Sequence, residues 1–486
     1  MTVVRRGFLV ALVYCSLSIS IISSLGALLI PTIAQQQHVS QAAAQWILTV
    51  ALVVGVVATP VLGALSDGRW RRRVLLVTMA GILFGTVLAA TARSFGQLLA
   101  GRAFQGLGYG VIPMAMSMAN RYLPPERRMR AIAILSVTAV TGAGLAFPIT
   151  GLIVQLWGIH AAFWFGALFA SVGLIALAIT APQDAPAPPL PGRLDILGGL
   201  LLATALAGLV LLVSEGDRWG WGSRSVLALA AITAVTLPLW TWQELRTERP
   251  LVDLRTLSNR TVLLANGAAL GIGGVLFASF SVISQLAQVP TRAGYGLGLG
   301  TLAAGFVLLP NSVGGQVSTR IVLRLTRRVS PVRLIAVSPA LLGVVTALLA
   351  RWHDELWQLL AATFVQGLAI GAGYVLMATM VADAVERDRL GAAAGLNHVL
   401  RTLGGAVGSA AVGAVVAAAT LPGQRLPAER AYTMSLTGTA VGCAVLALLL
   451  FCAGWFSPLP RSRSPKVGSA HAADGLLPPS VVDVST

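Results

Sequence analysis

An arginine lies inside a long apolar segment, where a charge is costly. Arg102 is about six residues into Gly96–Tyr122, and Gln105 follows one helical turn later. A guanidinium in hydrocarbon normally faces a partner or a water-filled cavity, so both residues are candidates for a transport pathway. The alternative is that Arg102 snorkels toward the membrane–water interface.

A second polar group lies in the apolar segment Gly391–Ala419, where Asn397, His398 and Arg401 fall within five residues. Histidine changes charge near neutral pH, so His398 could carry a proton. The alternative is a packed, neutral histidine bonded to a helix carbonyl. No acid lies convincingly at mid-membrane; Glu215 and Asp383 come closest, near the ends of their apolar segments.

A charged loop follows the second apolar segment. It carries Gly63, Asp67, Arg69, Arg71 and Arg72. A carboxylate beside several guanidiniums at the membrane surface can form ion pairs that hold one arrangement of two bundles and break in another. The alternative is an ordinary positively charged cytoplasmic loop with one neutralising acid.

Small residues and a proline interrupt another apolar segment. Gly144, Pro148 and Gly151 could form a hinge or could simply permit close helix packing. The apolar segments hold no cluster of His, Asp or Glu and no Ser/Lys pair of the kind that an intramembrane enzyme needs. We therefore expect no enzyme, no metal site and no cofactor.

The elements that must position these residues are membrane-spanning helices. The 486 residues are 56% hydrophobic and 10% charged, with a mean hydropathy of +0.81. A span needs about 20 apolar residues, and this criterion predicts fourteen: Phe8–Ile30, Ala44–Leu65, Val74–Ala92, Gly96–Tyr122, Ala131–Leu156, Ala161–Ala181, Ile196–Ser214, Ser225–Trp242, Thr261–Ala287, Gly298–Val322, Val332–Ala350, Leu356–Val381, Gly391–Ala419 and Ala431–Phe456.

The net charge of +17 reflects topology rather than a nucleic-acid partner, because most arginines lie in short loops between apolar segments. Positive loops stay in the cytoplasm, so we expect both termini there. The near-exclusive use of Arg over Lys, with abundant Ala and Gly, suggests a GC-rich bacterial gene and hence a bacterial plasma membrane, with the lipid bilayer as the surrounding partner. We expect a monomer.

Internal repetition predicts two related halves. The segment Leu98–Leu107 resembles Leu359–Leu368 in register, although two Ala/Leu/Gly-rich helices can also match by composition. We expect an N-terminal six-helix bundle over residues 1–181, a linker with two inserted helices over 182–244, a C-terminal six-helix bundle over 245–456 and a disordered cytoplasmic tail over 457–486.

These motifs resemble those of the major facilitator superfamily. The Gly63–Arg73 loop is similar to the superfamily's glycine–aspartate–arginine loop, although Gly68 and Trp70 depart from it. The Arg102 and 391–408 segments, with Pro31 and Trp46, are similar to those of the fourteen-span drug:proton antiporters. This resemblance implies an all-α polytopic fold, a gate role for Asp67, and proton or substrate contacts for Arg102 and Trp46.

The resemblance also implies a function: efflux of amphipathic or aromatic small molecules by alternating access, coupled to protons. The glycine–proline segment matches the exporter motif only in part, because Phe147 replaces a glycine. The first span, moreover, lacks the acid that proton-coupled relatives often carry there. A metabolite carrier that is uncoupled or coupled to another ion therefore stays an alternative, with a non-transport enzyme or sensor as a third.

Overall fold

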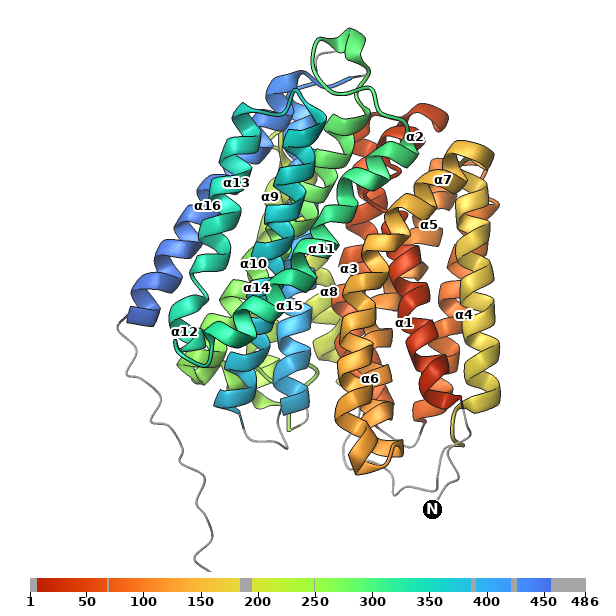
Figure 1. Ribbon diagram of the computed structural model, residues 1–486, viewed down its shortest axis with the longest axis vertical. Helices are drawn as coiled ribbons and strands as arrows, with labels where there is room; N and C mark the ends of the chain where they lie inside the picture. Colours follow the sequence, from red (N-terminus) through yellow and green to blue (C-terminus); the bar gives the residue numbers. More distant parts are fainter. Residues whose placement is uncertain are drawn as a thin grey trace, which may run out of the picture.

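The computed structural model describes residues 7–67, 70–183, 195–248, 250–385, 390–420 and 426–455. Over these ranges the chain consists of helices joined by turns and contains no β-strand. The long helices run side by side along one direction of the molecule (Figure 1). Helices that are apolar on all sides, as these are, bury one face in protein and leave the other for lipid.

The N-terminal half begins with a helix that ends six residues before the predicted end of the first span, Ile30. The chain order is α1 (Phe8–Ser24), α2 (Ile30–Gln36), α3 (Gln41–Asp67), α4 (Arg71–Ala90), α5 (Phe95–Gln105), the 3-10 helix η1 (Gly106–Gly110), α6 (Val111–Tyr122) and α7 (Pro125–Thr180). Helix α7 is two helices, because Gly158 adopts φ 82°, a left-handed conformation that glycine tolerates. The chain turns back there, so the two parts of α7 lie side by side (Figure 1).

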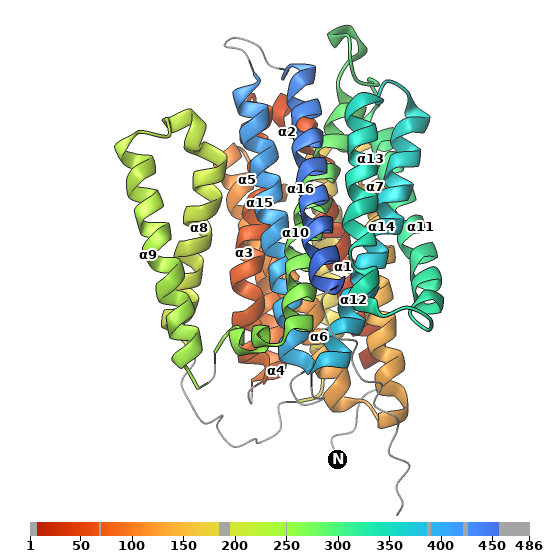
Figure 2. The ribbon, with the colours of Figure 1, turned by 90° about the vertical axis from the view of Figure 1, so that its left-hand side faces the viewer.

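The inserted pair and the C-terminal half follow. Their order is α8 (Ile196–Trp219), α9 (Arg224–Arg246), η2 (Leu254–Ser258), α10 (Arg260–Gln288), η3 (Thr291–Ala293), α11 (Thr301–Leu325), α12 (Pro331–Leu334), α13 (Val337–Arg351), α14 (Leu356–Ala384), α15 (Leu390–Ala418) and α16 (Glu429–Trp455). Figure 2 shows α8 and α9 as a hairpin at one side of the molecule, with α8 facing the bundle.

Ten helical segments of the described chain are long and apolar enough to cross a membrane. The remaining predicted spans correspond to α1, which has 17 residues; α11, which is more polar; the α5–η1–α6 pass, which η1 divides; and the first part of α7. The predicted fold class, a polytopic all-α protein of two six-helix bundles with an inserted helix pair, is thereby confirmed.

The buried apolar side chains are distributed unequally along the bundle. We call the end at which α1 begins and α16 ends the terminal end, and the end with the Gly158 turn the distal end (Figure 1). Toward the distal end a single apolar cluster includes Leu28 and Ile33 of the N-terminal half and Ile283 and Leu308 of the C-terminal half. Toward the terminal end, each half has an apolar cluster of its own.

Two smaller clusters join α3 to α15 and to the inserted α8, one with Leu52 and Ala406 and one, nearer the terminal end, with Val56 and Leu396. The broadest shared core of the two halves therefore lies toward the distal end, and nearer the terminal end the halves are joined along the α3–α15 seam.

Candidate transport pathway

Arg102 is fully enclosed, with 1% of its surface exposed. Its Nε donates to the carbonyl oxygen of Ile47 in α3 at 3.0 Å, and its Nη1 donates to that of Ile22 in α1 at 3.1 Å. Nη1 also donates to the side chain of Gln105. The guanidinium therefore points into the N-terminal half rather than toward the membrane surface.

Gln105 extends this network to a further helix. Its Nε2 donates to the hydroxyl of Thr86 in α4 at 3.0 Å, and that hydroxyl donates to the carbonyl of Ile82. Four helices, α1, α3, α4 and α5, are thus joined through one buried cation. Because buried hydrogen bonds to a charged group are strong, the network fixes the inner face of this half. A direct role of Arg102 in transport stays a prediction.

His398 connects the two halves at mid-depth. Its Nε2 lies 3.2 Å from the carbonyl oxygen of Tyr109 in η1, and its Nδ1 contacts Nη2 of Arg401. A guanidinium only donates, so Nδ1 must accept, and Nε2 must carry the hydrogen that is donated to Tyr109. His398 is therefore neutral in this arrangement.

Arg401 and two tyrosines complete the centre. The Arg401 guanidinium carbon lies 4.4 Å from the ring centroid of Tyr374 in α14, which is a cation–π contact. Tyr109 of η1 provides the backbone carbonyl that accepts from His398. Arg401, Tyr374 and Tyr109 all keep some exposed surface, so this part of the interior is not completely filled by protein.

Asn397 turns away from that centre, into the C-terminal half. Its Nδ2 donates to the Ala265 carbonyl at 3.1 Å and to Oδ1 of Asn266 at 3.2 Å, both in α10. Asn266 is 1% exposed, and its own Nδ2 has no hydrogen-bond partner. The structure thus brings His398 and Arg401 together but separates them from Asn397.

A polar network that the sequence did not single out joins the halves toward the distal end. Gln45 of α3 donates to the hydroxyl of Ser409 in α15 at 2.9 Å and accepts from that of Ser281 in α10 at 2.7 Å. Thr49 lies 2.8 Å from the same Ser409 hydroxyl, and Gln285 donates to Gln45 at 3.3 Å. These side chains are all buried, and they close the seam between α3, α10 and α15.

Trp46 lies apart from Arg102 and His398. Its Nε1 donates to Oε1 of Glu215 in α8 at 3.0 Å. The neighbouring side chain Val210 of α8 packs in one apolar cluster with Leu48 of α3 and Ala406 of α15. The inserted helix therefore lies along the seam between the halves, and Trp46 attaches it there.

Gly144, Pro148 and Gly151 lie where α7 of one half crosses α11 of the other. A Cβ on Gly151 would come within 2.5 Å of the Thr301 carbonyl oxygen, and a Cβ on Gly305 would come within 2.6 Å of that of Phe147. The two backbones are therefore in direct contact. Close packing of these small residues is observed; a hinge role stays a prediction.

The charged loop is only partly visible. Arg69 and the side chain of Asp67 lie outside the described residues, and a Cβ on Gly63 would meet no neighbour within 4 Å. Nη2 of Arg72 donates to the carbonyl of Ala178 in α7 at 2.7 Å, which fixes the start of α4 to the end of α7. Arg71 begins α4 beside it. The gate role of this loop stays a prediction.

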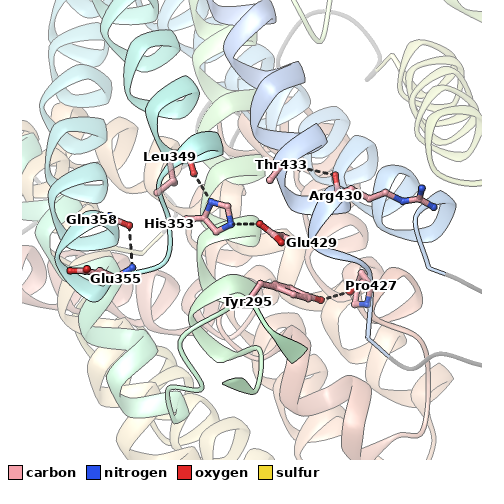
Figure 3. Close-up of polar contacts among 9 residues, drawn as sticks. All are labelled: Tyr295, Leu349, His353, Glu355, Gln358, Pro427, Glu429, Arg430 and Thr433. Carbon is pink, nitrogen blue, oxygen red and sulfur yellow. Dashed lines mark hydrogen bonds and ion pairs between the residues drawn. The ribbon is translucent and has the colours of Figure 1, made fainter. Parts of the chain in front are cut away.

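A further polar cluster braces the distal end of the C-terminal half (Figure 3). His353 Nδ1 donates to the Leu349 carbonyl oxygen, 3.0 Å away, and Nε2 lies 3.3 Å from Oε1 of Glu429 at the start of α16. The Tyr295 hydroxyl donates to the Pro427 carbonyl. Burial and the nearby Glu429 carboxylate raise the pKa of Tyr295, so it stays a neutral donor. Within the described chain, no group of three His, Cys, Asp or Glu side chains could hold a metal ion.

Comparison with known proteins identifies the family. The sequence matches the Major Facilitator Superfamily over residues 8–409 and, in an overlapping match, 323–480. The chain belongs to this superfamily. The fold agrees, because the crystal structure of peptide transporter POT in complex with sulfate superposes with a TM-score of 0.68 at 15% identity, covering 92% of this chain and 94% of that one.

The sequence relatives of this superfamily member include an uncharacterized transporter and a protein named for antibiotic resistance. An uncharacterized MFS-type transporter of Mycobacterium tuberculosis is 28% identical over 76% of this chain, which spans only 53% of that relative. The lincomycin resistance protein LmrB of Listeria monocytogenes is 24% identical, covering 86% of this chain and 88% of that one. The first of these relatives is named as a transporter of this superfamily and the second as a resistance protein.

Proposed function

We propose that this protein is a secondary active exporter of amphipathic or aromatic small molecules that works by alternating access. The observation that carries the proposal is the unequal core: the largest apolar cluster unites both halves at the distal end, whereas toward the terminal end each half has its own and the halves are joined only along α3, α8 and α15. A contact that is broad at one end and confined to one seam at the other fits one of the two states that alternating access requires.

The terminal end faces the cytoplasm in this proposal, because α1 begins there, α16 ends there, and the arginines that start α4 and end α11 lie there. The described arrangement is then inward-facing, and the Gln45–Ser409 network is the closed outer seal. Substrate enters from the cytoplasm of a bacterial cell and leaves when that seal opens. The resistance functions named for similar proteins support export over uptake.

Proton coupling is the second part of the proposal, and we assign it to His398. Protonation of Nδ1 would place two cations in contact, since Arg401 occupies that position. The contact between His398 Nδ1 and Arg401 would break. The contact between His398 Nε2 and the Tyr109 carbonyl could then be released as well. A proton arriving at His398 therefore favours a different arrangement of the two halves.

The test is dye accumulation in inverted membrane vesicles that carry the protein, with an imposed pH gradient and after its collapse. The probe set is ethidium, rhodamine 123 and fluorescein, each compared with vesicles that lack the protein. Gradient-dependent accumulation supports the exporter and its coupling. Accumulation that ignores the gradient retains the carrier and removes the antiport, whereas no accumulation of any dye contradicts the proposed substrate class.

A further inference from the structure

The charges inside the membrane passes are of one sign. Arg102 and Arg401 both lie well inside their passes; Arg401 is about 16 Å along α15 from Leu390. Every acidic residue in the described helices lies within four residues of a helix end, as Glu215 and Asp383 do. Among the residues that the structure describes, the middle of the bundle therefore carries positive charge that no carboxylate at the same depth balances.

Arg102 donates its N–H groups to several protein acceptors, whereas Arg401 leaves most of its N–H groups without a described acceptor. Arg102 uses its N–H groups on two backbone carbonyls and Gln105 and is fully buried. Arg401, in contrast, is partly exposed, and it makes one hydrogen bond, to a neutral histidine, with no ion pair to a described residue. A guanidinium has five N–H donors, so Arg401 retains several for a ligand.

The contact of Arg401 with Tyr374 leaves those donors available. The guanidinium carbon lies over the ring, a cation–π contact that uses no N–H donor, so the N–H groups can bind a carboxylate or another planar oxyanion. Tyr109 lies on the other half, where its backbone carbonyl accepts from His398, the hydrogen-bond partner of Arg401. An aromatic body can therefore contact the tyrosines while its acid group reaches Arg401.

The location of Arg401 matches a substrate site between the halves. Its contacts are His398 on its own helix, which touches Tyr109 of the N-terminal half, and Tyr374 of α14. The guanidinium thus contacts two side chains of the C-terminal half, one of which, His398, is in turn bonded to the N-terminal half. A cation would meet repulsion from two arginines at this depth, whereas an anion would replace the missing counter-charge.

We propose that the substrates of this protein are aromatic organic anions, and that Arg401 binds their acid group. This inference rests on the proposed function, since it names the charge class that the exporter accepts. It separates this chain from an exporter of lipophilic cations, whose site needs a carboxylate at mid-depth.

The experiment compares two xanthene dyes of similar shape and opposite charge, fluorescein and rhodamine 123, in inverted vesicles that carry the wild-type protein or one of three variants. Arg401→Gln removes the charge, Arg401→Lys keeps it, and Arg292→Gln is the matched control in an exposed loop. We expect wild type to accumulate fluorescein in preference to rhodamine 123. Arg401→Gln should lower fluorescein accumulation about tenfold or more and leave rhodamine 123 unchanged or raised, with partial rescue by Arg401→Lys.

The outcomes separate the two proposals. Transport of rhodamine 123 but not fluorescein by the wild type overturns the anion class and leaves the exporter intact. Equal loss of both dyes in Arg401→Gln overturns the role of Arg401 in charge recognition. Accumulation of neither dye, nor of ethidium, overturns the proposed function itself. Fluorescein anisotropy with purified protein provides a second readout, because weaker binding to Arg401→Gln than to Arg292→Gln is expected even if turnover is slow.

Discussion

His398 Nε2 lies 3.2 Å from the carbonyl oxygen of Tyr109, and this contact joins α15 of one half to the 3-10 turn of the other at mid-depth. The contact requires a hydrogen on Nε2, because Arg401 occupies Nδ1 as a donor. The protonation state of one side chain is thus tied to a contact between the two halves.

Replacing His398 by Gln should abolish the response of transport to a pH gradient. Glutamine can donate to the Tyr109 carbonyl but does not titrate, so dye movement down its own gradient should continue. The measurement is dye accumulation in inverted vesicles at several imposed gradients. His353→Gln, a histidine that also contacts a backbone carbonyl, serves as control. An unchanged gradient response in His398→Gln would remove His398 as the proton site.

Replacing Arg102 by Ala should lower transport about tenfold or more, because the carbonyls of Ile22 and Ile47 lose a charged donor inside the bundle. Arg102→Lys should restore little, since one ammonium cannot span both carbonyls and Gln105. The control is Arg93→Ala, in an exposed turn near the distal end. Equal effects of Arg102→Ala and Arg93→Ala on dye transport would show that the buried network is dispensable.

Replacing Gly151 by Val should hold the distal end open, because the new side chain meets the backbone of Thr301 and Leu302 rather than a movable side chain. Transport should fall about tenfold. A cysteine at Ser409, in a background with Cys452→Ser, should become reactive to an impermeant maleimide. Gly267→Val is the control, since a Cβ there meets nothing within 4 Å. If Ser409→Cys stays unreactive, this seam does not govern access.

Replacing Trp46 by Phe should lower the melting temperature of purified protein by a few degrees, since the hydrogen bond to Glu215 is part-buried and charge-assisted. Trp357→Phe removes a similar bond to Glu355 at an exposed position and should cost little. Fluorescence-monitored unfolding of both variants makes the comparison. Similar losses in the two would indicate that α8 is held to the bundle by apolar packing alone.

Replacing Asp67 by Asn should slow dye transport severalfold while leaving the protein inserted, if the loop after α3 acts as a gate. The charge is removed and the size is kept, so packing is preserved. Transport rates are compared at equal amounts of membrane-inserted protein. Turnover equal to that of the wild type would leave the loop as a determinant of topology only.

The sequence was sufficient for the helices and for the charged centre, for a simple reason. A charge in an apolar run is conspicuous, so Arg102 and Arg401 could be singled out without a structure. Likewise, the predicted spans ending at Leu156 and starting at Ala161 bracket the turn at Gly158. By contrast, the predicted first span runs to Ile30, whereas α1 ends at Ser24. Hydropathy could not predict this end, because Leu25–Leu29 are as apolar as the helix before them.

The seam between the halves could not be predicted. Gln45 and Ser409 are uncharged, and similar residues occur on many helices. They are important because they hydrogen-bond to each other although 364 positions separate them in the sequence, and no local sequence pattern encodes such a contact. Trp46 was singled out by resemblance alone, and its partner Glu215 lies 169 positions away. Periodicity reports which face of a helix is apolar, but not which helix covers it.

The crossing of α7 and α11 has a consequence for leakage. Where Gly151 meets Thr301 and Gly305 meets Phe147, peptide backbone lies against peptide backbone. A change of side-chain rotamer can open a gap only where a side chain fills it, and at these two contacts none does. Ions and water can pass this crossing only if whole helices separate, which is slow and concerted. In the exporter proposed above, these contacts would limit leakage while the protein waits, loaded or empty, between transport cycles.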